Sequence, residues 1–230
     1  MRPVLAVLGI AIGAILLSIL FQRPKELTSN PAERAEEKRV AEEKKVLAEY
    51  NKNNPKPKAG AFVAPKEGAV TAVLTVADRG DITMEFYPKA APKTVARLVE
   101  LIKSKFYDGI LIHRVAPGFV VQAGDPTTKK YKPADLAKLG DDDLAKLGIG
   151  SNGSGTNIPF EKNDLTNVAG SIAMALNSPK SATGDSQWFI NLVDNSFLNG
   201  DYCVFGKVTQ GMDVVPKIKK GDQIKQFTIK

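Results

Sequence analysis

Residues 106–125 read FYDGILIHRVAPGFVVQAGD, and the fold can be worked out from this stretch. Leu111 to Val115 and Phe119 to Ala123 are short apolar runs on either side of a Pro-Gly turn, so they predict two short strands. Arg114 and Gln122 lie an even number of positions apart. Because side chains alternate along a strand, both face the same side of the sheet if the turn preserves the alternation.

Further strand patterns lie on both sides of this stretch. Apolar residues alternate from Val70 to Val76 and again after a turn at 78–81, which predicts a β-hairpin with one buried face. Four later runs also predict strands: Ser171 to Ala175, Gln187 to Leu192, Val204 to Val208 and Lys225 to Lys230. Many short strands with Gly-rich turns are typical of a mainly β fold, here a closed antiparallel barrel.

Two helices are expected beside these strands. The first opens with Pro92, and apolar residues recur at helical spacing as far as Ile102. The second is expected from Gly211 to Ile218, where three apolar residues share one face. Because only these two helices are expected beside the strands, the predicted fold is mainly β.

Residues 3–21, PVLAVLGIAIGAILLSILF, carry no charge. As a helix they would span roughly 28 Å, close to the ~30 Å hydrocarbon core of a bilayer. A cleaved signal peptide is the competing interpretation, but its apolar region normally runs about 7–15 residues and ends at small residues. This run ends in bulky Leu20-Phe21, so we expect residues 1–22 to form a retained membrane anchor rather than a cleaved signal.

Two signals disagree about which side of the membrane the domain occupies. Lys and Arg are denser after the apolar run than before it, which by the positive-inside rule favours a cytoplasmic domain. A very short tail ahead of the span is instead common in anchors that export the domain that follows. We expect a single-pass membrane protein with an extracytoplasmic domain, against the positive-inside count.

Residues 23–60 are expected to form a charged, partly helical linker. They hold ten Lys+Arg and seven Asp+Glu, and residues 31–50 are rich in helix formers. Their apolar stripe is too narrow to bury much surface, so a solvated spacer is favoured over a partner-binding helix. The sequence NKNNPKPK at 51–58 then ends the helix as a stiff hinge.

Charge and composition exclude several functions. Of the net charge of +7, only +3 belongs to residues 61–230, which hold 21 Lys+Arg and 18 Asp+Glu, so nucleic acid is not an expected partner. One Cys and one His exclude an intramolecular disulfide and a multi-histidine or thiolate metal site. We therefore expect no cofactor, no metal and little classical acid–base chemistry.

Four stretches together resemble one known family. Residues 106–125, GSIAMA at 170–175, SQWFIN at 186–191 and FLNGDYCVFGK at 197–207 are similar to the cyclophilin family of peptidyl-prolyl cis/trans isomerases, its bacterial branch in particular. The likeness runs in order from Val70 to Ile229. It implies that residues 61–230 form an eight-stranded barrel capped by two helices, with an active site on the outer face that binds proline-containing polypeptides.

The resemblance also implies roles for individual residues. Arg114 is the expected catalytic donor, and Gln122 is expected to fix both the arginine and the bound peptide. Further substrate-binding positions are implied at Phe119, Val120, Ala175, Leu176, Phe189, Phe197, Leu198 and Tyr202. Taken without the resemblance, the apolar members of this set would be interpreted as plain core.

Isomerisation needs few chemical groups. An X-Pro amide resists rotation by roughly 18–20 kcal/mol because of resonance, which is lost in the twisted state. A catalyst must favour the twisted amide and donate a hydrogen bond to the electron pair that localises on nitrogen. The guanidinium of Arg114, charged and rigid, suits this task. His113, its neighbour in the strand, is expected to point to the opposite face and to have a structural role.

Some positions depart from the eukaryotic pattern of the family. Phe197 stands where those members carry Trp, Tyr202 stands in place of His, and Leu176 stands in place of Asn. The missing indole donor puts tight cyclosporin binding in doubt, while recognition of proline stays plausible.

Residues 127–155 are the largest departure, because family members usually have a short loop there. The sequence DLAKLG at 135–140 is repeated at 143–148, and each copy is expected to be a short helical turn closed by glycine. A tolerated surface insertion and a lid or docking element beside the site both remain open.

The function we expect is peptidyl-prolyl cis/trans isomerisation in folding proteins at or near a membrane. A membrane-tethered proline-binding scaffold or chaperone with little turnover is the alternative. Cysteine protease, nucleotide-binding and metal-dependent functions lack the residues that they need.

Overall fold

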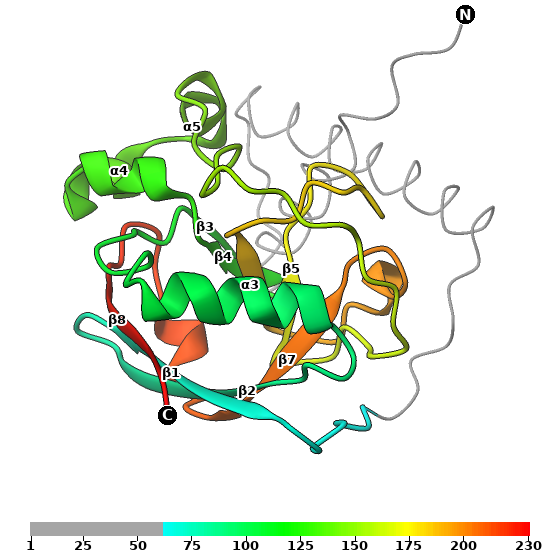
Figure 1. Cartoon of the computed structure of the whole chain (residues 1–230). Helices are drawn as coiled ribbons and strands as arrows, with labels where there is room; N and C mark the ends of the chain where they lie inside the picture. Colours follow the sequence, from blue (N-terminus) through cyan, green and yellow to red (C-terminus); the bar gives the residue numbers. More distant parts are fainter. Residues whose placement is uncertain (1–61) are drawn as a thin grey trace, which may run out of the picture.

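Eight antiparallel strands form one curved sheet in the computed structural model, which describes residues 62–230 (Figure 1). The strands are β1 (Val70–Val76), β2 (Gly80–Phe86), β3 (Arg114–Ala116), β4 (Val120–Ala123), β5 (Ser171–Met174), β6 (Trp188–Asn191), β7 (Val204–Gln210) and β8 (Ile224–Ile229). Their order across the sheet is β3-β4-β6-β5-β7-β2-β1-β8. The predicted mainly β fold is confirmed, and the predicted hairpin is the β1–β2 pair.

The predicted anchor, residues 1–22, and the predicted linker, residues 23–60, lie outside the described residues. Between residues 62 and 230, no helix has both the length and the apolar character needed to cross a membrane.

The two edge strands, β3 and β8, approach each other without a continuous ladder. One isolated bridge joins Leu111 to Gln223, and the Ile112 N–H donates to Asp222 O at 2.8 Å. The expected closed barrel is therefore an eight-stranded half-barrel whose edges are tied by short irregular segments. The chain ahead of β3 makes these contacts instead of β3 itself, since the N–H groups of Gly109 and Gly221 donate to Ile224 O and Ile112 O, each at 2.8 Å.

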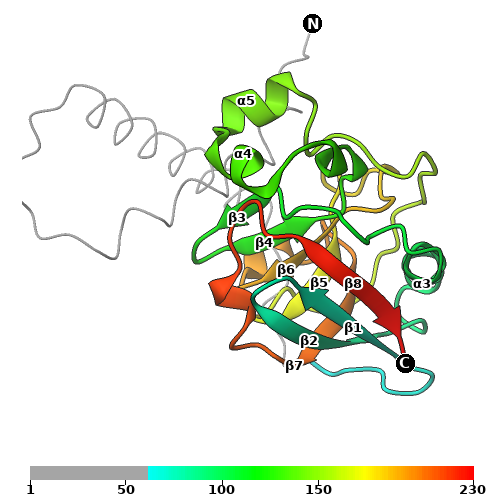
Figure 2. The same cartoon turned by 90° about the vertical axis from the view of Figure 1, so that its left-hand side faces the viewer.

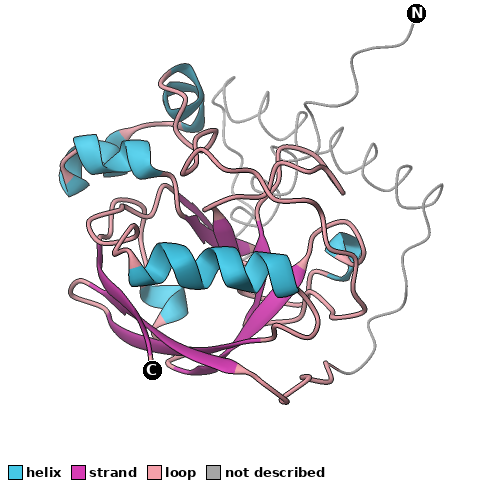
Figure 3. Ribbon diagram, viewed as in Figure 1, coloured by secondary structure: helices cyan, strands magenta, loops and turns pink. Residues whose placement is uncertain are grey.

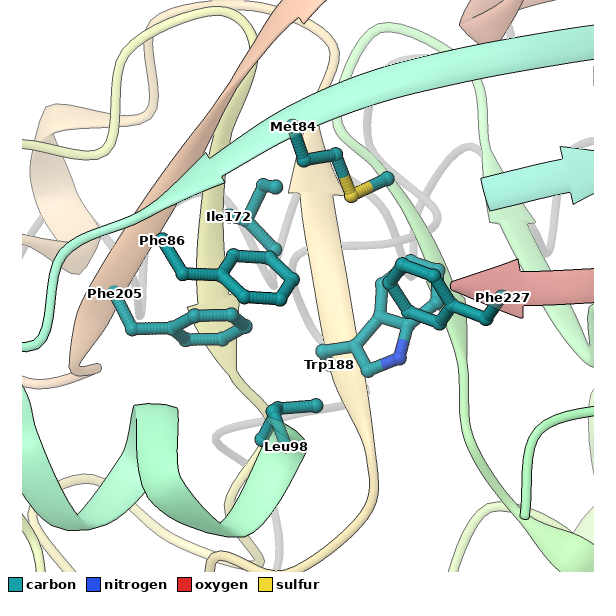
Figure 4. A pocket seen from close by; sticks show the side chains of 7 residues that line it. All are labelled: Met84, Phe86, Leu98, Ile172, Trp188, Phe205 and Phe227. Atoms are coloured by element: carbon teal, nitrogen blue, oxygen red, sulfur yellow. The ribbon is translucent and has the colours of Figure 1, made fainter. Parts of the chain in front are cut away.

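Alternate side chains of the strands fill the interior of this half-barrel. In β1, for example, Ala72, Leu74 and Val76 are buried while the residues between them are partly exposed. Figure 4 shows seven interior side chains that face one another: Met84, Phe86, Leu98, Ile172, Trp188, Phe205 and Phe227. They leave no room between them for a water molecule. The space inside these seven side chains is packed core, so it offers no binding site.

The helix α3 (Pro92–Lys103) lies across the sheet and buries one face on it (Figure 3). Proline stands in its first turn, as the sequence predicts, since its missing N–H would have no helical partner there. The carboxylate of Glu161 accepts from the N–H groups of Lys93 and Thr94, at 2.9 and 2.7 Å. This contact satisfies two of the unpaired donors at the start of the helix and stabilises its N-terminus.

The predicted second helix, Gly211 to Ile218, is wrong. The structure has turns there and only a 3₁₀ segment, η3 (Val215–Lys217). Pro216 has no N–H with which to bond the carbonyl four residues earlier, so a regular helix does not continue through it.

The insertion contains three short helical segments: η1 (Pro126–Lys130), α4 (Pro133–Lys138) and α5 (Asp141–Lys146). Both repeats thus contribute a helical turn, as predicted. Gly148 follows the second repeat at φ 69°, the left-handed form that favours glycine. Gly140 is different: its φ of −74° is ordinary, and it caps the start of α5 instead of closing α4. The prediction of a closing glycine is correct for the second repeat and wrong for the first.

The insertion lies above β3 and β4, on the side away from the β1–β2 hairpin (Figures 1 and 2). A small core of its own holds it there. Leu136 and Leu144, one from each repeat, pack with Leu111 and Ile149. Because these four side chains are buried together, the two helices are fixed to the domain rather than free of it.

Candidate functional site

A row of side chains crosses the outer face of the sheet. Arg114 lies opposite Gln122 on β3 and β4, Gln122 opposite Phe189 on β6, and Phe189 opposite Ala173 on β5. The predicted parity of Arg114 and Gln122 therefore holds through the turn. The residues that directly precede Gln122 and Phe189 in their strands, Val121 and Trp188, point into the interior instead.

Apolar residues surround this row as a second cluster, separate from the interior, which we call the outer cluster. Its buried members are Ala116, Phe119, Val120, Ala173, Phe189, Leu198 and Val204, and its partly buried members are Phe62, Leu165, Ala175, Phe197 and Tyr202. The Phe119 and Phe197 rings stack at 5.7 Å, and the Phe189 and Tyr202 rings meet edge to face at 5.8 Å. The outer cluster thus presents aromatic walls beside a charged group.

Arg114 is held in a defined place at the rim of the outer cluster. Its Nη1 donates to Gln122 Oε1 at 2.9 Å, and its Cζ lies 5.8 Å from the centre of the Phe119 ring. Burial lowers the pKa of Arg114, while electrostatic interactions with Asp141 and then Tyr202 act in the opposite direction. A guanidinium keeps its charge in either case. The arrangement therefore offers a fixed cation with hydrogen-bond donors beside an apolar surface.

Buried asparagines hold two walls of the outer cluster together. Asn195 Nδ2 donates to Phe119 O at 3.1 Å and to Asn191 Oδ1 at 2.7 Å. Asn191 in turn donates to Asn167 Oδ1 at 3.2 Å. Because Asn195 directly precedes η2 (Ser196–Leu198), these bonds tie that turn to the loop that carries Phe119.

The structure brings nine of the ten predicted site residues together. Arg114 and Gln122 adjoin the outer cluster. Seven other predicted residues belong to it: Phe119, Val120, Ala175, Phe189, Phe197, Leu198 and Tyr202. Leu176 is the exception. It is buried in the interior cluster, where Gly184 and Met174 are its neighbours. Alternation along the chain gives the reason, because Ala173 and Ala175 face outward and residues 174 and 176 face inward.

Gln187 is a site residue that sequence reasoning missed. Its Oε1 accepts from Gln122 Nε2 at 3.0 Å, and its own Nε2 donates to Asn152 O at 2.7 Å. The signal was available, because Gln187 precedes Phe189 by two positions and so shares its face of the strand.

His113 and Cys203 are both buried and take no part in this row. The His113 ring lies beside Gly150 of the insertion, and its two nitrogens have no hydrogen-bond partner among the described residues. Its pKa is lowered to about 4, mainly by burial, while the nearby Asp125 raises it and Arg114 lowers it by smaller amounts. Burial also raises the pKa of Cys203 to about 12. Both groups are neutral near pH 7, which agrees with the structural role expected of His113.

Within the described part of the chain, no three His, Cys, Asp or Glu side chains are grouped so that they could hold a metal ion. The groups that this face presents are a guanidinium, two carboxamides and an apolar surface. Such a set can bind and orient an uncharged peptide group.

Comparisons with known proteins point to one family. The family model for cyclophilin type peptidyl-prolyl cis-trans isomerases matches residues 71–230. The "Probable peptidyl-prolyl cis-trans isomerase" of Brucella abortus is 39% identical over 183 residues, which cover 75% of this chain and 88% of that protein. The "Peptidyl-prolyl cis-trans isomerase B" of Bacillus subtilis is 36% identical over 161 residues, covering 69% and 97% of the two chains.

Solved structures agree with this assignment at the level of the fold. The crystal structure of a cyclophilin type peptidyl-prolyl cis-trans isomerase from Cryptosporidium parvum has a TM-score of 0.56 and 24% sequence identity, and covers 70% of this chain and 98% of its own. With the family model and the bacterial relatives, this shows that the chain belongs to the cyclophilin-type peptidyl-prolyl cis-trans isomerases and is an enzyme of that class.

Proposed function

We propose that Arg114 accelerates rotation about X-Pro bonds by stabilising the twisted amide. Rotation localises an electron pair on the proline nitrogen, and a guanidinium N–H can donate to it only after the amide has twisted. Such a bond is stronger in the transition state than in the ground state, which is the condition for catalysis. The observation that carries the proposal is the fixed place of Arg114, bonded to Gln122 at 2.9 Å at the rim of the outer cluster.

The outer cluster would hold the proline ring. Phe119, Phe189 and Leu198 are less than a tenth exposed, so they form a preformed apolar wall rather than mobile side chains. Burying the ring against this wall leaves the carbonyl side of the bond free to turn, while the ring stays in place. We assign substrate contact to Val120, Ala175, Phe197 and Tyr202 as well, because they adjoin the same surface.

Of the two neighbouring positions expected to bind substrate, Ala175 and Leu176, we assign substrate contact only to Ala175, which faces outward. Leu176 is left out because its side chain is buried in the interior cluster. A relative from Cryptosporidium parvum has been crystallised in the presence of the dipeptide Ala-Pro, so short Ala-Pro peptides are suitable probes of this surface.

A protease-coupled assay with an Ala-Pro tetrapeptide tests the mechanism. Arg114→Ala should lower kcat/KM by about 10²-fold or more, the effect typical of removing one transition-state donor. Exposed Lys225→Ala is the matched control for loss of a positive charge and should keep the wild-type rate. An Arg114→Ala enzyme as fast as the wild type would refute the mechanism. Tight peptide binding without turnover in the wild type would favour the alternative, a proline-binding scaffold or chaperone.

We also propose that residues 3–21 anchor the enzyme in a membrane, with the domain on the extracytoplasmic side, where it would act on proline-containing proteins as they fold. The support is the uncharged run itself and the charged spacer that separates it from the domain. Protease added to intact cells should cleave the domain and leave a membrane-bound fragment. Protection of the domain in intact cells, with cleavage after lysis, would contradict the proposed side.

A further inference from the structure

Residues 150–155, the end of the insertion that returns to the sheet, are held by two buried carboxylates, and we call this segment the limb. Asp125, two residues after the end of β4, accepts through Oδ2 from the N–H groups of Gly150 and Asn152, at 2.6 and 3.2 Å. Asp185, ahead of β6, accepts from the N–H of Gly155 at 3.0 Å. Asp125 is fully buried and Asp185 is 6% exposed. Charge-assisted bonds of this kind fix the backbone from Gly150 to Gly155 against the sheet.

The fixed limb ends a chain of hydrogen bonds that begins at Arg114. The Asn152 carbonyl accepts from Gln187 Nε2 at 2.7 Å, Gln187 Oε1 accepts from Gln122 Nε2 at 3.0 Å, and Gln122 Oε1 accepts from Arg114 Nη1 at 2.9 Å. Both glutamines are less than a tenth exposed. A neutral carboxamide has one accepting end and one donating end. The three bonds therefore share one direction.

That direction is set at both ends of the chain of hydrogen bonds, and the insertion supplies one of these ends. The Asn152 carbonyl can only accept, so Gln187 must turn its NH₂ toward Asn152 and its oxygen toward Gln122. Gln122 must then turn its own oxygen toward Arg114. If either amide were flipped, two donors or two acceptors would face each other in a buried place, which costs about 1–3 kcal/mol for each unsatisfied group. The Asn152 carbonyl, which only accepts, and the Arg114 guanidinium, which only donates, therefore require the same orientation of both amides.

The packing of the insertion favours this bracing role over that of a mobile lid. Leu136 and Leu144 are buried in the small core shared with Leu111, and the Lys220 ammonium donates to the Leu139 carbonyl. A lid would have to break these contacts each time it opened. The limb contacts the site through a backbone group, the Asn152 carbonyl, which accepts from Gln187. It thus ends the chain of bonds through Gln187 and Gln122 to Arg114, which we call the glutamine relay.

We propose that Asp125 is a positioning residue of the isomerase site: by holding the N–H groups of Gly150 and Asn152, it aims the Asn152 carbonyl at Gln187 and so orients Gln122 and Arg114. The inference rests on the proposed role of Arg114. It makes the insertion a structural part of the active site rather than a neutral surface loop.

Asp125→Asn in the full chain is the first test. The introduced amide has one accepting oxygen and no charge, so its NH₂ faces either the Thr127 N–H or the N–H groups of Gly150 and Asn152. In either orientation the bonds to the limb lose the negative charge that strengthens them. We expect kcat/KM for an Ala-Pro peptide to fall about tenfold through misplacement of Arg114, with KM changed less than kcat. Thr127→Val is the matched control, because it removes only the 2.6 Å bond from the Thr127 hydroxyl to Asp125 Oδ1 and leaves Oδ2 intact. The control should keep the wild-type rate.

A double-mutant cycle separates positioning from general weakening. If Asp125 acts through the relay, Asp125→Asn should cause little further loss once Gln187→Leu has already broken it. Additive losses in the cycle, or an Asp125→Asn enzyme that folds and keeps full activity, would overturn the proposal.

Gln187→Glu tests the same relay without altering Asp125. The introduced carboxylate cannot donate to the Asn152 carbonyl, so the rate should fall at pH 8 and recover as the pH is lowered and the carboxyl gains a proton. A purely structural defect would not recover with pH, and a flat profile would contradict the relay.

If Arg114→Ala leaves the wild-type rate unchanged, the proposed function fails instead. The NMR signals of the Gln122 and Gln187 amides in Asp125→Asn then still test the relay, and unshifted signals would refute it.

Discussion

The interior and the outer face of the half-barrel are both lined with aromatic residues, yet they have opposite properties. They are built from the same strands: in β6, Trp188 points inward and Phe189 points outward. The interior cluster is filled so tightly that no water fits between its central side chains. The outer cluster instead borders Arg114 and two carboxamides. Alternation along a strand therefore separates the residues that stabilise the fold from those that can bind a substrate.

The largest effect on stability should come from Trp188→Ala. Trp188 is 1% exposed and packs against Tyr107 and Phe227, so the cavity should lower the free energy of unfolding by about 4 kcal/mol. Urea denaturation measures this loss. The kcat/KM of the fraction that stays folded should be close to that of the wild type. A loss below about 1 kcal/mol would mean that the interior is not the structural core that the packing indicates.

The second effect concerns His113, at the boundary between β3 and the insertion. Its pKa is about 4 in the folded state and about 6.5 when unfolded. The unfolded state therefore binds more protons between these values, and stability should fall as the pH drops from 6.5 to 4, by about 3 kcal/mol in total. Denaturation midpoints measured at a series of pH values for the wild type and His113→Leu would show this. Equal pH dependence in the two proteins would contradict the buried, unpartnered place of the ring.

The smallest effect on stability should come from Phe197→Ala in the outer cluster. Phe197 is partly exposed and stacks on Phe119, so its loss should cost about 1 kcal/mol of stability. Because the ring borders the proposed proline site, kcat/KM should nevertheless fall about tenfold. Trp188→Ala is the matched comparison. If Phe197→Ala proved neutral in rate, the outer cluster would be no more than a satellite core.

Much of the sheet could be predicted because the alternation of apolar residues is a local signal. The β1–β2 hairpin and β4 follow from it directly, whereas β3 begins at Arg114, three residues later than the strand expected from Leu111. The helix expected from Gly211 to Ile218 rested on the spacing of apolar residues alone. That spacing takes no account of Pro216, which has no backbone N–H for the helical hydrogen bond. Closure of the barrel depends on how distant edges meet, and no local pattern reports that.

The same limit applies to the site. The resemblance assigned Leu176 by its place in a motif, whereas the inward and outward alternation turns it away from the outer cluster. The spacing of Gln187 from Phe189 indicates its face of the strand, but its partners, Gln122 and Asn152, come from other segments. Contacts between segments far apart in sequence decide such roles, and only the folded chain shows them.

The most direct test of the central claim is NMR exchange between the cis and trans forms of an Ala-Pro peptide, at equilibrium, with catalytic amounts of the full chain. The wild type should exchange the two forms far faster than the uncatalysed rate of tens to hundreds of seconds. Arg114→Ala should bind the peptide, seen as shifts in Phe119 and Phe189, but leave exchange close to the uncatalysed rate. Fast exchange with Arg114→Ala would contradict the claim that this arginine on the outer face performs the reaction.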